Sequence, residues 1–192
     1  MRGRIAEKAA ELFAESGYAG VSMRMIAGKL GIKAASLYNH YPDKESLYFA
    51  ALAHAFEKRF AAIEAAAISD KKSAEQRLTE TLAVVGRATI DDPVSTRLLQ
   101  RELLEADDRR LRELTETLFQ EPFDRIVGLL EELDGKRNAA TLSLYVTALI
   151  HGYFSLAPIW RYLTFDGPIP DTPEKLAGDL VDALTSYLSA TA

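Results

Sequence analysis

The chain has 192 residues, of which 48% are hydrophobic, and this length suffices for one domain or two small ones with a sizeable apolar core. It contains no cysteine, which excludes disulfides, thiolate metal sites and cysteine nucleophiles and indicates a reducing compartment, the cytoplasm. The formal net charge of -5 argues against a nucleic-acid protein when the chain is taken as a whole, and the first residues lack the apolar stretch of a secretory signal.

The charge is distributed unevenly along the chain. Residues 1–60 hold nine Lys and Arg against six Asp and Glu, a net charge of +3, whereas residues 61–192 carry a net charge of -8. This asymmetry favours contact between the first part of the chain and a polyanion. The alternative is chance, because an excess of +3 is small.

Capping residues indicate where the first four helices begin and end. Gly17 ends the first helix and Gly31 the second, because glycine adopts the left-handed conformation without strain. Ser22 is a suitable N-cap for the second helix. A short third helix follows and is broken at Pro42, after which Asp43 caps a long fourth helix.

Similar signals mark the next three helices. Ser73 and Gln76 form a capping box that opens the fifth helix. Asp92, followed by a proline suited to the first helical position, opens the sixth. The seventh is expected over residues 108–133, and Pro122 inside it should kink or divide it.

The eighth helix is expected in a stretch of 23 residues, 138–160, that contains no Asp, Glu, Lys or Arg. Its length would allow it to span a bilayer. It also contains His151 and several Ser and Thr residues, which would be costly in lipid, so we expect no membrane contact and a helix buried on several sides in a soluble protein. A proline-rich loop, residues 165–173, precedes a last helix opened by Thr172. The pattern as a whole predicts an all-α fold of about nine helices.

Catalytic and metal-binding patterns are missing from the sequence. The chain has three histidines, none paired at the spacing of metal ligands on a helix, and it has no phosphate-binding glycine loop or nucleophile elbow. We therefore expect a protein that is not an enzyme and that needs no metal or cofactor.

Residues 22–41 contain two short helices joined by a glycine turn, which is the helix-turn-helix pattern. In that motif the second helix enters the major groove of DNA. Ala34 and Ala35 are small enough for close approach to bases, and Lys33 can donate to a guanine edge. Side chains able to donate to phosphate oxygens are Arg24, Ser36, Tyr38, His40 and Lys44. Helix pairs of this kind also occur in all-α proteins that bind no DNA.

Residues 9–52 resemble the DNA-binding head of TetR-family (TetR/AcrR-like) transcription regulators, through the skeleton "ELF…GY…S…IA…LG…LY.H…KE.L". The resemblance implies an N-terminal three-helix head with a helix-turn-helix and a helical regulatory body. It places a DNA-binding domain at residues 1–48 and a ligand-binding and dimerisation domain at residues 49–192. The chain departs from the family pattern, which commonly has Ser at Lys33, Gly or Pro at Ala35, and Asp or Glu at Met25.

The resemblance also implies which residues bind DNA. Contacts to the DNA backbone are implied for Ser22 and Arg24, contacts to bases for Lys33, Ala34, Ala35 and Ser36, and contacts to phosphates for Tyr38, His40 and Lys44. The recognition helix lacks a capping side chain at Lys33, so it is expected to fray in the absence of DNA.

For the body, the resemblance implies a homodimer and a pocket for a largely apolar small-molecule effector. The expected dimer interface consists of Leu142, Tyr145, Val146, Leu149, Leu180, Leu184 and Leu188. The expected pocket residues are Leu99, Leu103, Phe119, Phe123, His151, Phe154 and Trp160. The resulting hypothesis is a ligand-responsive transcriptional regulator, a repressor that binds a palindromic double-stranded DNA operator. The alternative is an all-α protein that binds a small molecule or a partner and no longer reads DNA.

Overall fold

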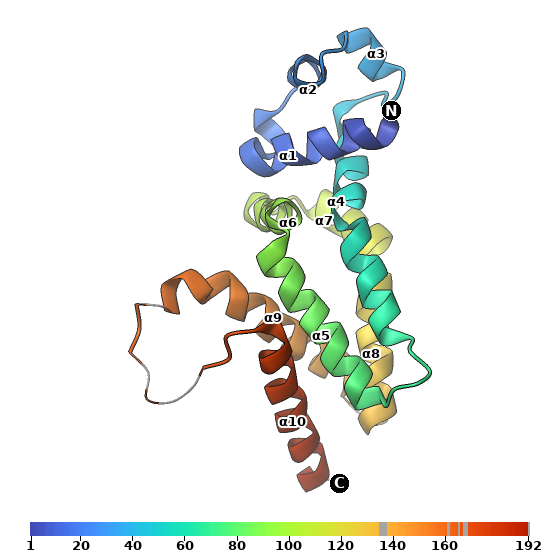
Figure 1. Ribbon diagram of the computed structural model, residues 1–192. Helices are drawn as coiled ribbons and strands as arrows, with labels where there is room; N and C mark the ends of the chain where they lie inside the picture. Colours follow the sequence, from blue (N-terminus) through green and yellow to red (C-terminus); the bar gives the residue numbers. More distant parts are fainter. Residues whose placement is uncertain (135–137, 161, 165, 167–168, 192) are drawn as a thin grey trace. The chain divides into compact units, whose positions relative to one another are not determined.

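The computed structural model describes residues 1–134, 138–160, 162–164, 166 and 169–191, and every regular element in these ranges is helical (Figure 1). The all-α class predicted from the sequence is therefore confirmed. The helices are α1 (Arg2–Gly20), α2 (Met23–Leu30), α3 (Ala34–Tyr38), α4 (Lys44–Ala67), α5 (Ala74–Asp91), α6 (Pro93–Glu105), α7 (Asp108–Leu114), a π-helical turn η1 (Thr115–Phe119), α8 (Gln120–Asp134), α9 (Ala139–Trp160) and α10 (Pro173–Thr191).

Contacts divide the chain into two compact units. Unit 1 comprises Met1–Lys58 and Asp92–Leu118, and unit 2 comprises Arg59–Asp91 and Phe119–Ala192. Helices α6 and α7 therefore belong to the same unit as the N-terminal helices. The functional boundary after residue 48 stays a prediction, because a unit of contacts is not by itself a functional domain.

The predicted helix caps of unit 1 are confirmed. The Ser22 hydroxyl accepts a hydrogen bond from the Met25 N–H at 3.2 Å, and the Asp43 carboxylate accepts one from the Ser46 N–H at 2.7 Å. Gly31 ends α2 with a left-handed φ of 68°. At Gly17 the backbone has φ 72° and ψ 170°, so helical geometry is interrupted there, although helical residues continue to the end of α1.

The predicted caps of the later helices are confirmed as well. The Ser73 N–H donates to Gln76 Oε1 at 3.1 Å, and the Gln76 N–H donates to Ser73 Oγ at 3.2 Å, which is the reciprocal pattern of a capping box. Asp92 accepts a hydrogen bond from the backbone N–H three residues later at 3.1 Å, and Thr172 does the same at 3.2 Å. Local spacing therefore locates these helix starts correctly.

The helix predicted over residues 108–133 is divided, but the division lies before Pro122 rather than at it. Pro122 occupies the first turn of α8, where its missing N–H costs little. The irregularity is the π turn η1 just upstream, in which a wider turn takes up the mismatch. The predicted seventh helix thus becomes α7, η1 and α8, which accounts for ten α-helices within the described ranges where about nine were predicted.

Helix α5 is the centre of unit 2, where it packs against α8, α9 and α10 (Figure 1). Leu78, Leu82, Leu130 and Ile150 are fully buried in this core. At Gly86 a Cβ atom would lie 2.9 Å from the Pro173 side chain and 3.1 Å from the ring of a phenylalanine on α9. A glycine at this position therefore permits the close approach of α5 to the start of α10.

Helix α9 has one buried face and one open face. Val146, Ile150 and Phe154 are buried, whereas Tyr145 and Leu149 are 61% and 55% exposed. The sequence predicted a helix buried on several sides, but only 22% of its most apolar window is buried. By length and composition α9 passes the test for a membrane span, alone among the described helices. A helix with one apolar face open to partners in a soluble protein passes the same test.

Candidate functional site

The two helices of the predicted DNA-reading motif are held by a small number of core residues. Ile26 and Ala27 of α2 and Leu37 of α3 are buried. The turn between the helices is closed by a hydrogen bond from the Ile32 N–H to the Ala27 carbonyl at 3.0 Å. Leu37 alone fixes which side of the short helix α3 faces the core, so its remaining residues are available to contact another molecule.

The residues predicted to face bases lie at the surface of unit 1. Lys33, Ala35 and Ser36 are exposed, and Ala34 is partly exposed. Lys33 is the N-cap residue of α3 and makes no capping hydrogen bond through its side chain, as the sequence indicated. The expected fraying of α3 without DNA stays a prediction.

The residues predicted to hold phosphates differ in their surroundings. Tyr38 is 50% exposed, Arg24 is exposed, and His40 is partly exposed. Ser22 uses an oxygen lone pair as the α2 cap, which leaves its hydroxyl hydrogen available to donate. Lys44 stands in the first turn of α4, where the helix dipole favours an anion.

The Lys44 ammonium is positioned by an aromatic ring. Its Nζ lies 4.2 Å from the centroid of the Tyr18 ring, a cation–π contact. Burial lowers the pKa of Lys44, and the Glu105 carboxylate partly offsets that effect. Tyr41, also in the motif, is buried instead, and its hydroxyl donates to the Arg2 carbonyl at 3.2 Å. Tyr41 therefore fastens the start of α1, whereas Tyr38 stays at the surface.

Behind the motif, a buried polar network joins α4, α6 and α7. Glu102 is 1% exposed; it accepts a hydrogen bond from the Tyr48 hydroxyl and another from Arg110 Nε at 3.3 Å. Arg110 also donates to Glu105 at 2.6 Å, and its guanidinium lies 4.7 Å from the centroid of the Tyr18 ring. The Tyr18 ring, which contacts the Lys44 ammonium, is thus also contacted by Arg110 of this network. No local pattern in the sequence predicts this network, because Tyr48 lies more than 50 positions from the residues of α6 and α7 that it joins.

Side chains of α6 also form hydrogen bonds with backbone groups near the end of α1. Arg101 donates to the Ala14 carbonyl at 2.8 Å and to the Glu15 carbonyl at 2.5 Å, while the Tyr18 N–H donates to Glu105 at 3.2 Å. Carbonyls at the end of a helix lack partners within the helix, so these contacts tie α6 to the N-terminal head.

The predicted pocket residues are divided between the two units. Leu99 and Leu103 lie on α6 in unit 1, where Leu103 is 59% exposed, and the other five lie in unit 2. Phe119 packs edge-to-face on Phe60, with ring centroids 5.7 Å apart. Phe123 is partly buried on α8. The structure groups only two of the seven, both on α9, around one described pocket.

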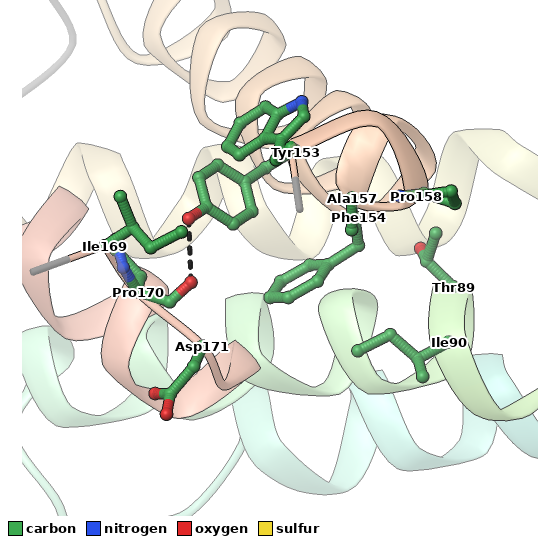
Figure 2. Close-up of a pocket in the computed structure, with 10 residues that line it drawn as sticks. Thr89, Ile90, Tyr153, Phe154, Ala157, Pro158, Ile169, Pro170 and Asp171 are labelled. Atoms are coloured by element: carbon green, nitrogen blue, oxygen red, sulfur yellow. Dashed lines mark hydrogen bonds between the residues drawn. The ribbon is translucent and has the colours of Figure 1, made fainter. Parts of the chain in front are cut away.

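That pocket has a volume of about 560 Å³ and lies within unit 2 (Figure 2). Phe154 and Trp160, both predicted, line it together with residues that the sequence did not single out: Thr89, Ile90, Tyr153, Ala157, Pro158, Ile169, Pro170 and Asp171. Its size is within the range of small-molecule sites, about 300–1,000 Å³. The residues missed by sequence reasoning come from the end of α5 and from the segment before α10, which meet α9 only in the fold.

Hydrogen bonds hold two walls of the pocket. The Tyr153 hydroxyl donates to the Pro170 carbonyl at 2.7 Å and so fastens the segment before α10 to α9 (Figure 2). The Thr89 hydroxyl donates to the Val85 carbonyl at 3.0 Å and lies 3.2 Å from His151 Nδ1. His151 is thus behind the pocket wall, and burial, with a smaller effect from Arg59, lowers its pKa.

The predicted dimer-interface residues fall into two groups. Val146 and Leu184 are buried in the core of unit 2, and Leu142, Leu180 and Leu188 are partly buried against that core. Tyr145 and Leu149 are exposed, and the open face of α9 also presents the exposed apolar side chains Leu144, Leu156 and Ile159. Among the described residues, no group of three or more His, Asp and Glu side chains could hold a metal ion.

Comparison with known proteins agrees with these observations. Residues 5–51 match the family model described as bacterial regulatory proteins, tetR family. The chain is 44% identical over 48 residues to the biofilm operon icaADBC HTH-type negative transcriptional regulator IcaR of Staphylococcus epidermidis, a match covering 25% of this chain and 26% of that protein. It is 29% identical over 106 residues to the HTH-type transcriptional repressor KstR of Mycolicibacterium smegmatis, covering 55% and 52%. The chain thus matches about a quarter and about half of the length of these two curated relatives.

The similarity in fold extends over the whole chain. A TetR transcriptional regulator from Chloroflexus aurantiacus J-10-FL has a crystal structure that superposes with a TM-score of 0.72 at 25% identity, covering 98% of this chain and 93% of that one. The part of the chain that carries the exposed helix-turn-helix is thus the part that is similar to DNA-binding transcriptional regulators. The chain as a whole is similar in fold to that TetR transcriptional regulator, and residues 5–51 are the part that matches the TetR family model.

Proposed function

We propose that the protein is a ligand-responsive, non-enzymatic repressor that acts in the cytoplasm and binds a palindromic operator as a homodimer. The observation that carries the proposal is the surface of α3, where Lys33, Ala35 and Ser36 are exposed while Leu37 alone is buried. A short helix with this distribution gives little to the core, and its exposed residues suit base edges in a major groove.

The dimer is supported by the open face of α9. Tyr145 and Leu149 are large and more than half exposed, and they lie one turn apart on a helix whose sequence carries no charge. Exposed apolar patches of this kind mark interaction sites. A second copy is the simplest partner, because a two-fold interface pairs the same patch on both subunits. Two recognition helices related by that two-fold axis would read half-sites about 34–36 Å apart.

The response to ligand is supported by the pocket of unit 2, whose lining is mainly apolar. A ligand changes operator binding only if it binds the DNA-competent arrangement and the incompetent one with different affinities. We therefore propose that the effector favours an arrangement of the dimer in which the two recognition helices no longer match the spacing of the operator.

The experiment that tests this function is a gel shift with the DNA upstream of the protein's own gene at several salt concentrations. A protein that contacts phosphates releases counterions, so we expect the affinity to fall roughly a thousandfold between about 50 and 200 mM salt. Lys71→Ala serves as a control, because it removes an exposed lysine of unit 2. A shift that does not depend on salt, or no shift at micromolar protein, would instead favour a small-molecule- or partner-binding protein that does not read DNA.

A further inference from the structure

Two exposed arginines lie in the first turn of α1. Arg2 and Arg4 are both open to solvent, whereas Ile5, which follows them, is fully buried in unit 1. Neither guanidinium forms an ion pair with a carboxylate in the ranges that the structure describes. Ile5 and Ala6 therefore pack this turn against the core, and the two positive charges are available to a molecule outside the chain.

The start of α1 is fixed beside the helix-turn-helix. The Tyr41 hydroxyl donates to the Arg2 carbonyl at 3.2 Å, and the Arg2 guanidinium lies 5.0 Å from the centroid of the same ring, a cation–π contact. Tyr41 is buried and directly follows His40, one of the residues predicted to bind phosphate. Figure 1 shows the start of α1, marked N, near the loop between α3 and α4. Arg2 is therefore held next to the end of the recognition helix.

Several arginines elsewhere in the described chain have glutamate partners. They are Arg77, Arg87, Arg109, Arg110 and Arg125. Arg2 resembles Lys44 instead, because each cation contacts a tyrosine ring: the Lys44 Nζ lies 4.2 Å from the centroid of the Tyr18 ring. An aromatic ring holds a cation in place without neutralising its charge. Arg2 thus keeps a full positive charge at a defined position beside the motif.

From these observations we propose that Arg2 and Arg4 bind phosphate groups of the DNA backbone beside the major groove that α3 enters. Arginine recognises phosphate through paired N–H donors and remains charged at every accessible pH. Contacts of this kind fix the position of a protein on DNA without reading bases. This inference rests on the proposed function of unit 1 as the DNA-binding part, and it extends the site beyond the motif at residues 22–41.

The salt dependence of the affinity tests this contact, because it reports the number of phosphates that a protein neutralises. Dissociation constants of the full-length protein for the DNA upstream of its gene are measured at several salt concentrations. We expect Arg2→Ala/Arg4→Ala to reduce the salt dependence by about two ions for each protomer bound, and to weaken binding roughly tenfold or more at about 100 mM salt. Arg4→Ala alone leaves the contact between Arg2 and Tyr41 intact and should reduce the salt dependence by about one ion per protomer.

Two further double variants are the controls. Arg97→Ala/Arg112→Ala removes the same charge from two exposed arginines of α6 and α7 in the same unit, and it should leave the salt dependence unchanged within about half an ion. Arg2→Lys/Arg4→Lys keeps both charges and should keep the wild-type salt dependence, because counterion release depends on charge. Circular dichroism of every variant checks that its helical content is that of the wild-type protein.

Three results would overturn the proposed contact: an unchanged salt dependence in the folded alanine variants, an equal reduction in Arg97→Ala/Arg112→Ala, or a reduction in the lysine variant as large as in the alanine one. Wild-type protein that binds DNA with a steep salt dependence keeps its proposed function in each of these cases. Wild-type protein that does not bind the DNA loses both the proposed function and this contact.

Discussion

The Tyr48 hydroxyl donates a hydrogen bond to the carboxylate of Glu102, and both residues are only 1% exposed although they are 54 positions apart in the chain. Burial and the hydrogen bond to Glu102 raise the pKa of Tyr48 far above its ordinary value, so the phenol remains a donor throughout the accessible pH range. Arg110, 7% exposed, is the cationic partner of the same carboxylate. Helices α4, α6 and α7 of unit 1 are thereby joined by buried polar contacts.

The first prediction concerns this network. Glu102→Gln removes the buried carboxylate that pairs with Arg110 while Glu105 remains, and it should lower the free energy of unfolding by about 2 kcal/mol, because a hydrogen bond to a charged group contributes about 1.5–3 kcal/mol. Tyr48→Phe, which removes one hydrogen bond, should cost about 1 kcal/mol. Urea unfolding followed by circular dichroism measures both. Glu116→Gln, at an exposed position of η1, is the control; a Glu102→Gln variant as stable as that control would contradict the prediction.

The start of α3 gives the second prediction. Lys33 occupies an N-cap position without a capping bond, so Lys33→Ser should raise the free energy of unfolding by about 0.5–1 kcal/mol. Ser22→Ala removes an existing cap and should lower it by about 1 kcal/mol. Chemical unfolding of the two variants beside the wild-type protein tests this pair. The capping argument fails if Lys33→Ser is less stable than the wild-type protein.

A third prediction separates positioning contacts from base reading. Tyr38→Phe and Lys44→Ala should each weaken binding to all DNA sequences. Lys44→Ala should also reduce the salt dependence by about one ion, since it removes a cation that neutralises a phosphate, whereas Tyr38→Phe should leave the salt dependence unchanged. Lys33→Ala should instead change which operator variants are preferred. Dissociation constants for a panel of operator variants at several salt concentrations distinguish the two effects. If all three variants bind like the wild-type protein, α3 is not the reading helix.

The fourth prediction compares two glycines of unit 2. Gly86→Ala would place a Cβ atom 2.9 Å from the Pro173 side chain, so it should lower the free energy of unfolding by about 1–3 kcal/mol. At Gly128 on α8 nothing lies within 4 Å of an added Cβ atom, so Gly128→Ala should raise the stability by up to about 1 kcal/mol through helix propensity. Thermal unfolding of both variants shows whether the effects have opposite signs, and equal effects would refute the close-approach argument.

The fifth prediction concerns the proposed dimer. Tyr145→Asp or Leu149→Asp would place a charge on the open face of α9 and should convert the dimer to monomers with little change in secondary structure. Sedimentation velocity measures the oligomeric state. Ile68→Asp is the matched control, because Ile68 is also a large exposed apolar residue but lies outside α9. Wild-type protein that sediments as a monomer, or α9 variants that remain dimeric, would exclude this face as the interface.

The features that the sequence predicted correctly depend on residues close together in the chain. A cap is defined by the residue at a helix start and an N–H three positions later, so Ser22, Asp43 and Ser73 could be assigned from spacing. The helix-turn-helix is likewise a local pattern within residues 22–41. The break was predicted at Pro122, but it lies a few residues earlier, in the π turn that precedes α8.

The features that the sequence did not predict depend on distant pairs. Nothing local indicates that Glu102 contacts Tyr48, or that Tyr153 contacts Pro170, because each pair joins separate helices or segments. Helical periodicity also could not divide the apolar residues of α9 between core and surface, since nearly all of its positions are apolar. In the structure, Val146 is buried in the core and Tyr145 is exposed at the surface.

The uncapped start of α3 has a consequence for how such a regulator diverges. Lys33 is exposed and contributes no capping bond, so the fold places little constraint on which residue stands there. Ala35 and Ser36 are exposed in the same way, whereas Leu37 carries the packing. Mutations at the three exposed positions can therefore accumulate without loss of a folded protein. Under the proposed function, a duplicated copy of the gene can therefore acquire a new operator through this helix while the rest of the chain stays unchanged.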